Sequence, residues 1–487
     1  MKILLVQPPF TIFKSETKKC HPPLGLAYLS AVLADRHEVK VLDAIAQGYN
    51  RQEYIDKSFF RYGLSFEDIK KNIERLKPDI IGISCLFSAQ SENAHAICKV
   101  AKEVDSRIIT VLGGAHPTAL PGETLIDKNV DFVIIGEAEE ALKELVERLD
   151  KSSRYDDIEG ISFRCNSQIK INQRTNYFDN LDKIPFPRWD IFPLERYLEI
   201  NNPHGACAKK VPFLPVITSR GCPFECIFCS IHNIWGRKYR TRSAQNVLAE
   251  INYLKARFSV KEIMFEDDNL TLDYDRAVQI FQRMICDNLG MIWTTPNGIA
   301  AQTLDERMLD LMRNSGCYRV SIGVESGDKN ILKNIIRKPI MLSRVKPIID
   351  KARRVGMETV LFFVVGLPQE DRDSLKNTFR LAEGLGADNV NFFFATPLPG
   401  TRLLEECKNA GLIDRELDYA RLKSDFPYFS TKFLNERKLA SLVNRERLKL
   451  QILYLLRHPG KSVYKIWHKF INEPIRLFKL RLKYTDA

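Results

Sequence analysis

Residues 1–145 alternate short apolar segments with segments of helical spacing. The apolar segments are rich in Ile and Val and nearly continuous, which is typical of parallel strands buried on both faces. Stretches between them, such as Leu24–Leu33 and Ala94–Val104, have helical periodicity. We therefore predict a doubly wound, Rossmann- or flavodoxin-like α/β domain, which binds ligands at the carboxyl ends of its strands. The predicted strands are Lys2–Gln7, Val39–Asp43, Asp79–Ser84, Arg107–Leu112 and Asp131–Ile135.

A second α/β series occupies residues 211–415, after a connector at 146–210 that includes a hairpin over Gly160–Arg164 and Ile169–Ile171. Six apolar strands alternate with helical patterns such as Ala244–Phe258, which predicts a full or partial parallel barrel with its chemistry at the carboxyl ends of the strands. Residues 416–487 lack strand alternation and are predicted to be helical. The six predicted strands are Pro215–Thr218, Glu262–Phe265, Ile292–Thr295, Arg319–Gly323, Thr359–Val365 and Asn389–Phe394.

Length and composition are those of a globular protein of two or three domains. No apolar run approaches the ~18 residues of a membrane span. Pro8 and Pro9 interrupt the apolar start of the chain too early for a signal peptide. Eleven cysteines without a secretion signal indicate the reducing cytoplasm.

The net charge of +12 is concentrated near the C-terminus, because residues 437–487 hold 13 basic and 3 acidic residues. The charge therefore says little about the catalytic body, and nucleic-acid binding is disfavoured because no recognised module accompanies it. Apolar residues such as Val463, Trp467 and Phe478 share faces with interspersed lysines. One hypothesis is peripheral contact of this basic tail with anionic lipid on the inner membrane surface. The other is that the tail packs on the barrel or caps its active site.

Cys222, Cys226 and Cys229 follow the first strand of the second series in a Cys-x3-Cys-x2-Cys loop. Three thiolates from one loop can hold an iron–sulfur cluster that leaves one iron without a protein ligand, as a catalytic cluster requires. Structural zinc usually takes four ligands in two separated pairs, and Cys207 is the candidate for a fourth. The spacing favours the cluster, with zinc as the alternative.

Unusual residues also follow the strands of the first domain. Glycines at these positions allow close approach of a ligand to the backbone. The sequence lacks Gly-x-Gly-x-x-Gly after the first strand, which argues against a dinucleotide. The candidate ligand contacts are Pro9, Asp43, Ala44, Ser84, Gly113, Gly114, His116, Gly136 and Glu137.

With these motifs the chain resembles the cobalamin-binding radical S-adenosylmethionine (SAM) enzymes over residues 1–415. The resemblance implies a partial (βα)6 barrel in which Cys222, Cys226 and Cys229 hold a [4Fe–4S] cluster. It also implies that the amino and carboxylate groups of SAM chelate the fourth iron. Phe228 resembles the aromatic residue that packs near the adenine.

Other strand ends of the barrel resemble SAM contacts of this superfamily. Glu266, Asp267 and Asp268 stand where the methionine amino group is expected, although a solvated acidic turn is the alternative. Glu325 and Ser326 resemble the segment near the ribose and carboxylate. Gly366 belongs to the adenine-supporting motif, where Gln369 departs from the glycine that is common in the family.

The N-terminal domain resembles the cobalamin module of these enzymes. Well-known cobalamin proteins carry Asp-x-His-x-x-Gly, whose histidine ligates cobalt from below. Here the segment is Asp43-Ala44-Ile45-Ala46-Gln47-Gly48, so the resemblance implies cobalt without a lower histidine. His116 is either a contact of the corrin or a structural loop residue.

The resemblance implies reductive cleavage of SAM to a 5′-deoxyadenosyl radical, with the electron supplied by a flavodoxin- or ferredoxin-type donor. The radical would abstract hydrogen from an unactivated carbon of a small-molecule or lipid-like substrate lying between the domains. Methyl transfer from methylcobalamin is the main expectation, and oxidative cyclisation or rearrangement is the alternative. A non-catalytic iron–sulfur carrier or sensor is the alternative of another class, and the open iron position argues against it.

Overall fold

The apolar segments near the N-terminus form the centre of a seven-stranded sheet in the computed structural model, which describes residues 1–166, 168–413 and 416–457. The five predicted strands pair in parallel in the order β8-β7-β6-β1-β3, which is the flavodoxin-like order. The predicted hairpin extends this sheet antiparallel along β8. These strands are β1 (Lys2–Gln7), β3 (Glu38–Asp43), β6 (Ile80–Ser84), β7 (Ile109–Gly113), β8 (Phe132–Ile134), β9 (Ile161–Cys165) and β10 (Gln168–Ile171).

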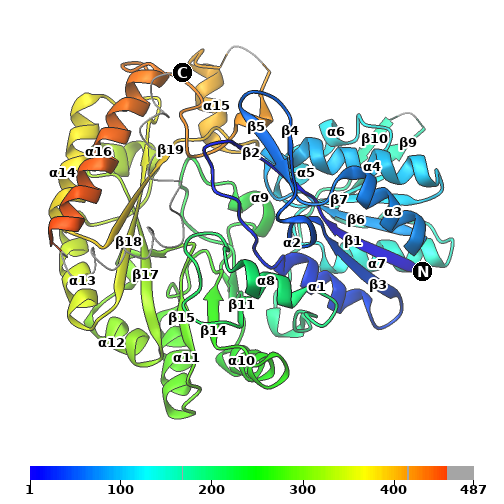
Figure 1. Cartoon of the computed structure of the whole chain (residues 1–487), viewed down its shortest axis with the longest axis horizontal. Helices are drawn as coiled ribbons and strands as arrows, with labels where there is room; N and C mark the ends of the chain where they lie inside the picture. Colours follow the sequence, from blue (N-terminus) through cyan, green and yellow to red (C-terminus); the bar gives the residue numbers. More distant parts are fainter. Residues whose placement is uncertain (167, 414–415, 458–487) are drawn as a thin grey trace.

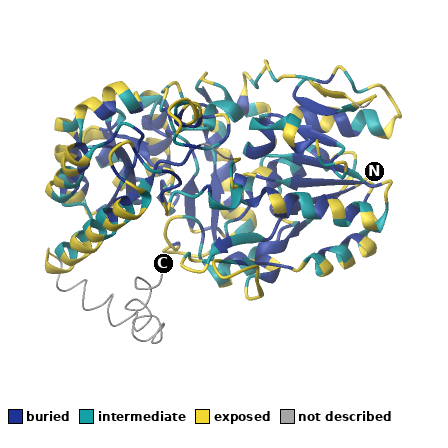
Figure 2. Cartoon of the chain, turned by 90° about the horizontal axis from the view of Figure 1, so that it is seen from above, coloured by how far each residue is buried: buried dark blue, intermediate teal, exposed yellow. Residues whose placement is uncertain are grey.

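The central parallel strands of this sheet are buried on both faces because their side chains alternate between two apolar layers, whereas β10 at the edge is exposed. Ile3 and Leu5 of β1 share a core with α1 (Leu24–Leu33) and α7 (Glu139–Asp150). Leu4 and Val6 point to the opposite layer, which α3 (Phe66–Leu76) and α4 (Ser91–Val104) cover. Figure 2 shows the buried strands between helices whose outer faces are exposed.

The second module is an open barrel of six parallel strands in the order β11-β14-β15-β17-β18-β19. All six predicted strands are present, with ends shifted by no more than two residues. The strands are β11 (Phe213–Val216), β14 (Glu262–Phe265), β15 (Ile292–Thr294), β17 (Cys317–Glu325), β18 (Glu358–Val365) and β19 (Asn389–Phe394). The outer helices are α10 (Ala244–Phe258), α11 (Tyr274–Cys286), α12 (Glu306–Asn314), α13 (Leu342–Arg354), α14 (Arg372–Leu385) and α15 (Arg402–Asn409).

Two small sheets were not predicted from the sequence. A three-stranded antiparallel sheet lies beyond the ends of the N-terminal strands, and a two-stranded ribbon flanks the cysteine loop. Their strands are β2 (Phe10–Phe13), β5 (Phe59–Tyr62) and β4 (Gln52–Tyr54), then β12 (Ser219–Arg220) and β13 (Arg240–Thr241). The remaining short elements are α2 (Ala44–Gly48), η1 (Ser88–Gln90), α5 (Ala115–Ala119), α6 (Pro121–Thr124), η2 (Leu181–Lys183), α8 (Leu194–Ile200), α9 (Ile231–Trp235), β16 (Ile299–Ala300), η3 (Ala301–Thr303), η4 (Ile331–Ile336) and η5 (Tyr419–Arg421).

The two modules lie side by side, with the N-terminal module in blue and cyan and the barrel in green to orange (Figure 1). They share one apolar core, which runs from α1 through Trp189 and Tyr197 of the connector into the barrel. The carboxyl ends of β11 and β8 are joined by buried ion pairs described below.

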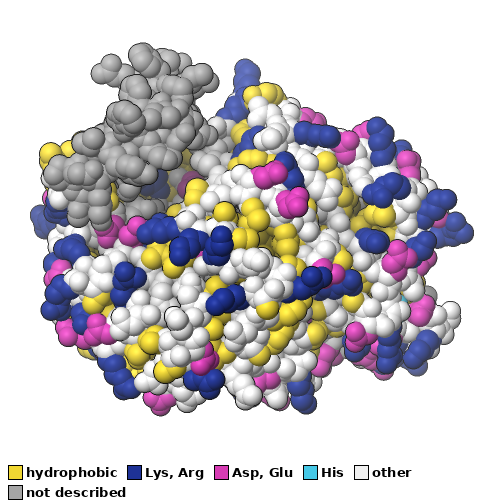
Figure 3. Space-filling model, turned by 60° about the horizontal axis from the view of Figure 1, so that its bottom comes forward, with side chains coloured by type: hydrophobic (Ala, Val, Ile, Leu, Met, Phe, Trp, Pro, Cys, Tyr) yellow, Lys and Arg dark blue, Asp and Glu magenta, His cyan; other side chains and the backbone are white. Residues whose placement is uncertain are grey.

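Within the C-terminal region, the helical prediction holds for α16 (Glu436–Arg457), which buries Leu439 and Val443 against the barrel. Residues 416–435 form only the short η5 helix, and the tail faces built on Val463, Trp467 and Phe478 lie outside the described residues. On the face shown in Figure 3, basic side chains are scattered among acidic and apolar ones. None of the helices in the described part of the chain is long and apolar enough to cross a membrane.

Candidate active site at the junction of two modules

The cysteine loop is anchored on both sides before any ligand is considered. The ribbon β12–β13 brackets it, and Gly221 makes the turn at φ +85°, where a Cβ would stand 2.4 Å from the carbonyl oxygen of Lys238. Within the loop, the backbone of Ile227 accepts a hydrogen bond from Leu403 N–H and donates one to Ile336 O. These contacts fix the loop on the barrel.

The three thiols of the loop lie within electrostatic reach of one another, because Cys229 and Cys222 both add to the raised pKa of Cys226. Each thiol is half-buried and free. Burial raises the pKa of Cys226 and Cys229 to about 12, so a bound metal is needed to hold them as thiolates. Cys207, the candidate fourth zinc ligand, is exposed and lies beside Lys19.

Lys338 is a buried cation at this loop that was not predicted from the sequence. Its Nζ lies 2.6 Å from Glu325 Oε1 and donates to Gly323 O at 3.3 Å. Burial lowers the pKa of Lys338, but the Glu325 carboxylate and the nearby Cys226 and Cys222 outweigh it and raise the pKa overall. No sequence signal identifies this lysine, because it reaches the site from the loop after η4.

The three acids after β14 have three different surroundings. Asp267 is buried and accepts hydrogen bonds from Thr218 and Ser219, so it holds the start of the cysteine loop. Asp268 Oδ2 is buried with no hydrogen-bond partner among the described residues. Burial raises the pKa of Asp268 to about 7, and the neighbouring Asp267 adds to the shift.

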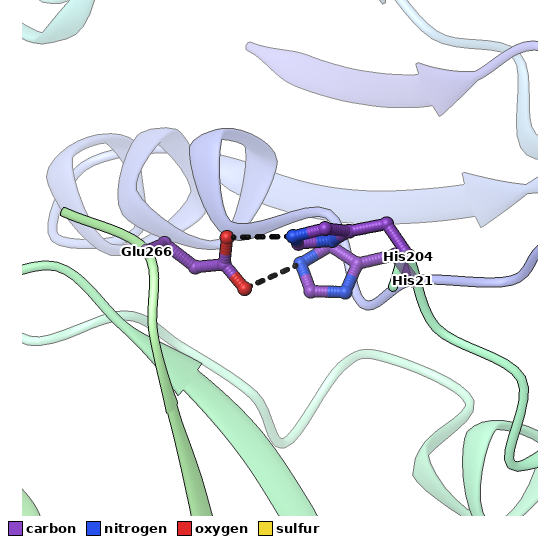
Figure 4. Close-up of side chains that lie close together, drawn as sticks. All are labelled: His21, His204 and Glu266. Carbon is purple, nitrogen blue, oxygen red and sulfur yellow. Dashed lines mark ion pairs between the residues drawn. The ribbon is translucent and has the colours of Figure 1, made fainter. Parts of the chain in front are cut away.

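Of the three acids after β14, Asp268 is the one whose charge acts on the cysteine thiols. It adds to the effect of burial in raising the pKa of Cys222 and Cys229. Glu266 instead points to two histidines (Figure 4). Its carboxylate oxygens lie 3.6 Å from His21 Nε2 and 3.1 Å from His204 Nε2.

The other predicted SAM contacts also differ in what their side chains do. Ser326 is fully buried and its hydroxyl lies 3.1 Å from Thr378 Oγ1, which is a structural contact. Gly366 has φ +82° and donates its N–H to Glu370 at 2.5 Å. Phe228 is half-buried in the apolar cluster around Ile227.

The carboxyl ends of β1 and β6 form the rim expected to hold cobalamin, since the strand order reverses between them. Pro9 lies two residues beyond β1, and Ser84 is the last residue of β6. Leu86 and Phe87, which the sequence analysis did not select, follow β6 with 51% and 58% of their surface exposed. An exposed apolar pair on this rim suits the largely apolar face of a corrin ring.

Gly113 and Gly114 end the adjacent strand β7 on the same rim. Gly114 has φ +119°, and a Cβ there would stand 2.5 Å from the carbonyl oxygen of Cys85. Only glycine fits this turn without displacing backbone.

Asp43 has a structural task on this rim. It caps α2 by accepting from the N–H groups of Ile45 and Ala46 at 2.9 Å, and it accepts from the Tyr197 hydroxyl at 2.6 Å. Burial raises the pKa of Asp43 to about 6 despite these hydrogen bonds. Ala44 and Ile45 are buried in the same turn, so the position that the resemblance matches to the histidine of Asp-x-His-x-x-Gly holds a buried apolar side chain.

His116 is buried with Nδ1 3.1 Å from Ser88 Oγ and its ring against Tyr419 at 4.9 Å. Burial lowers its pKa to about 4, so the imidazole is neutral near pH 7. These contacts support the structural alternative for His116.

Gly136 and Glu137 lie just after β8, where the two modules meet. Gly136 donates its N–H to Thr118 Oγ1 at 3.0 Å. The Glu137 carboxylate is fully buried and lies 3.1 Å from Arg220 and 2.9 Å from Arg240, both on the ribbon that brackets the cysteine loop. Glu139 pairs with Arg220 at 2.5 Å. We call these four residues the junction network; it leaves Glu137 no exposed carboxylate for a ligand.

Residues 418–431, the C-terminal strap, return from the barrel to the N-terminal module. The Tyr419 hydroxyl donates to Glu123 Oε1 at 2.6 Å, and Lys423 Nζ lies 2.6 Å from Glu16 Oε2. Beside the cysteine loop, α9 packs against α5 of the other module. The junction is thus closed from two sides by contacts between distant parts of the chain.

Comparisons with known proteins agree with both modules. The family model for the B12 binding domain matches residues 11–146, and that for the Radical SAM superfamily matches residues 216–382. The chain is 35% identical to cytidylyl-2-hydroxyethylphosphonate methyltransferase of Streptomyces wedmorensis, covering 86% of this chain and 84% of the relative. It is 32% identical to an uncharacterized methyltransferase of Pyrococcus horikoshii, with 91% of each chain covered.

Among solved structures, the radical SAM methyltransferase TsrM from Kitasatospora setae, with cobalamin and a [4Fe-4S] cluster bound, has the same fold. The TM-score is 0.68 at 17% identity, over 86% of this chain and 79% of TsrM. These findings confirm the predicted fold class and the predicted cofactors, namely cobalamin, a [4Fe–4S] cluster and SAM. The chain belongs to the cobalamin-dependent radical SAM methyltransferases.

Proposed function

We propose that this enzyme methylates an unactivated carbon of a small-molecule substrate held between its two modules. The observation that carries the proposal is the junction network, because it ties the end of β8 to the start of the cysteine loop. The carboxyl ends of both sheets therefore face one site, as transfer between a cobalamin module and a radical SAM barrel requires.

When bound, the cluster, SAM and cobalamin supply the electron transfer, the radical and the methyl group. Cys222, Cys226 and Cys229 would hold the cluster on the barrel loop. Asp268, whose oxygen is buried without a partner, would accept a hydrogen bond from the SAM ammonium group. Phe228 and Gly366 would border the adenine.

The buried pair of Lys338 and Glu325 would set the charge beside the cluster. Lys338 brings one positive charge near Cys222 and Cys226, which favours a reduced, more negative cluster. Glu325 holds the lysine in place and stands at φ +66°, a left-handed conformation that is costly for a side-chain-bearing residue.

For cobalamin, we propose a rim made by Pro9, Ala44, Ser84, Gly113 and Gly114. Leu86 and Phe87 would add apolar contact with the corrin. Ile45 in the place of the histidine leaves the lower face of cobalt without an imidazole from this segment. The junction network and the C-terminal strap would exclude water from the space between the modules.

Further proposals concern domains and partners. The catalytic modules span 1–145 and 211–415, joined by the connector 146–210 and followed by the C-terminal region 416–487. A flavodoxin- or ferredoxin-type protein in the cytoplasm would donate the electron. The eleven free cysteines support a reducing compartment. A lipid-like substrate and peripheral membrane contact through the basic tail are the more specific alternatives for partner and location.

The test is an anaerobic assay of reconstituted enzyme with SAM, methylcobalamin and a strong reductant. We expect 5′-deoxyadenosine and S-adenosylhomocysteine, and loss of the former in Cys226→Ala. Cys286→Ala removes an exposed cysteine on α11 and serves as the matched control. Enzyme that contains a full cluster yet releases no 5′-deoxyadenosine would refute the proposal.

A further inference from the structure

Three metal-ligating side chains from distant parts of the chain meet at the mouth of the barrel. His21 comes from the loop before α1, His204 from the connector, and Glu266 from the residue directly after β14. One ligand atom from each lies within 4.8 Å of the other two. Figure 4 shows both imidazoles facing the carboxylate.

The spacing of these atoms fits one metal ion. Tetrahedral ligands at about 2.1 Å from a metal stand about 3.4 Å apart. Glu266 oxygens lie 3.1 Å from His204 Nε2 and 3.6 Å from His21 Nε2, on either side of that value. The longer of these contacts is too long for a hydrogen bond.

Polar atoms of the cluster are left without partners. Glu266 Oε1 and His21 Nδ1 are buried and form no hydrogen bond within the described residues. Such orphaned groups cost free energy unless an unseen ligand satisfies them. An ion between the three side chains would satisfy the carboxylate oxygen directly.

The surroundings hold the three ligands in position. Asn297 Nδ2 donates to the backbone oxygen of Glu266 at 2.8 Å and to its Oε2 at 3.2 Å, an orienting contact of the kind found around metal ligands. The loops that carry the two histidines are tied by Cys20 N–H donating to Asn202 O at 2.8 Å. Lys19 Nζ adds hydrogen bonds to Asn202 and Gly205.

We propose that His21, His204 and Glu266 bind one divalent transition-metal ion of the zinc or ferrous class. Two imidazoles and one carboxylate suit these ions and leave coordination positions open. The site is distinct from the cysteine loop, and it joins the N-terminal loop, the connector and the barrel.

The site lies at the carboxyl end of β14, where Glu266 begins the loop that also carries Asp268. Resting on the proposed function, we assign its open coordination positions to an oxygen-anion group of the substrate, such as a phosphoryl or carboxylate group. Such a group would be anchored through the metal while the reacting carbon stays free.

Equilibrium dialysis of the reconstituted enzyme against Zn²⁺ tests the site, with zinc, iron and cobalt counted together by mass spectrometry. We expect one zinc per chain in the wild type and at least tenfold weaker binding in His204→Gln and in Glu266→Gln. Cys207→Ser and His95→Gln are the matched controls. Cys207 is an exposed thiol three residues after His204, and His95 is a histidine that pairs with Asp127 away from the site. The zinc affinity of both control variants should equal that of the wild type.

Unchanged iron and cobalt contents show that the variants fold. Wild-type enzyme that binds no zinc, or His204→Gln that binds it as tightly, would overturn the metal site. Inorganic phosphate that binds without zinc and is lost in His204→Gln would assign the histidines to an anion instead. Zinc affinity that phosphate leaves unchanged would overturn the substrate assignment. A failure of the proposed function can be told apart from a failure of the metal site. In the first case the enzyme would bind zinc but release no 5′-deoxyadenosine.

Discussion

Glu137→Gln is the sharpest perturbation of the junction between the modules. It keeps the shape of the side chain and removes the carboxylate charge shared by Arg220 and Arg240, whose side chains are 3% and 2% exposed. Arg220 retains Glu139, whereas Arg240 keeps no acidic partner among the described residues and is left with the backbone oxygens of Phe178 and Trp235 and the ring of Tyr177. Removing one partner of a buried ion pair costs about 3–5 kcal/mol because the other charge stays buried.

At about 2 °C per kcal/mol for a module of this size, we expect the Tm to fall by about 6 °C or more. Differential scanning fluorimetry of the reconstituted enzyme measures the shift, and iron content reports whether the cysteine loop still holds its cluster. Glu140→Gln is the matched control, since Glu140 is the exposed neighbour and its loss should change stability by less than about 0.5 kcal/mol. Equal shifts in the two variants would refute the role of the network. Neutralising Arg240 as well, in Glu137→Gln with Arg240→Met, should recover part of the loss.

The remaining predictions concern the rim, the cluster and the tail. Burial raises the pKa of Asp43 to about 6, so the folded enzyme binds this proton more tightly than the unfolded chain does. The free energy of unfolding gained from this proton is full below about pH 4 and is lost as the pH rises through 6. Asp43→Asn should thus raise the Tm at pH 7.5 more than at pH 4.5, and an equal gain at both would contradict the assignment. Gly114→Ala should weaken cobalamin binding and destabilise the enzyme by more than about 1 kcal/mol, whereas Gly25→Ala, with open space around its Cβ, should stabilise it by about 0.5–1 kcal/mol. Lys338→Met should shift the cluster reduction potential to more negative values in an EPR titration, and an unchanged potential would place the lysine charge too far away to matter. A chain ending at residue 436 should lose liposome flotation if the basic tail binds anionic lipid, and equal flotation would exclude that contact.

The sequence predicted the strands of both modules because each strand is a short, nearly continuous apolar run. Such a run is the local pattern of a parallel strand buried on both faces. The sequence also singled out the loop of Cys222, Cys226 and Cys229, because three cysteines within one loop are a local pattern. β2, β4 and β5 escaped prediction because their pairing is set by contacts across the chain. Glu137 looked like a ligand contact because it follows a rim glycine, yet Arg220, more than eighty positions later, takes up its charge.

Lys338, His21 and His204 are residues that could not be predicted from the sequence for the same reason. Each is an isolated polar residue in a connecting segment, and nothing nearby in the sequence marks it. Their significance depends on folding that brings them to Glu325 and Glu266. Local patterns therefore identified the cysteine loop, whereas the charges around it could be found only in the tertiary structure.

The C-terminal strap has a consequence for how this enzyme is made. All strands of the N-terminal sheet have been synthesised once residue 171 leaves the ribosome, but the contacts of this module with Tyr419 and Lys423 form only after the barrel has also been made. During synthesis the rim that would receive cobalamin is consequently uncovered on that side, and the strap reaches it last. Because the strap follows the barrel in the sequence, cobalamin could reach the rim of the nascent chain before the strap closes the junction.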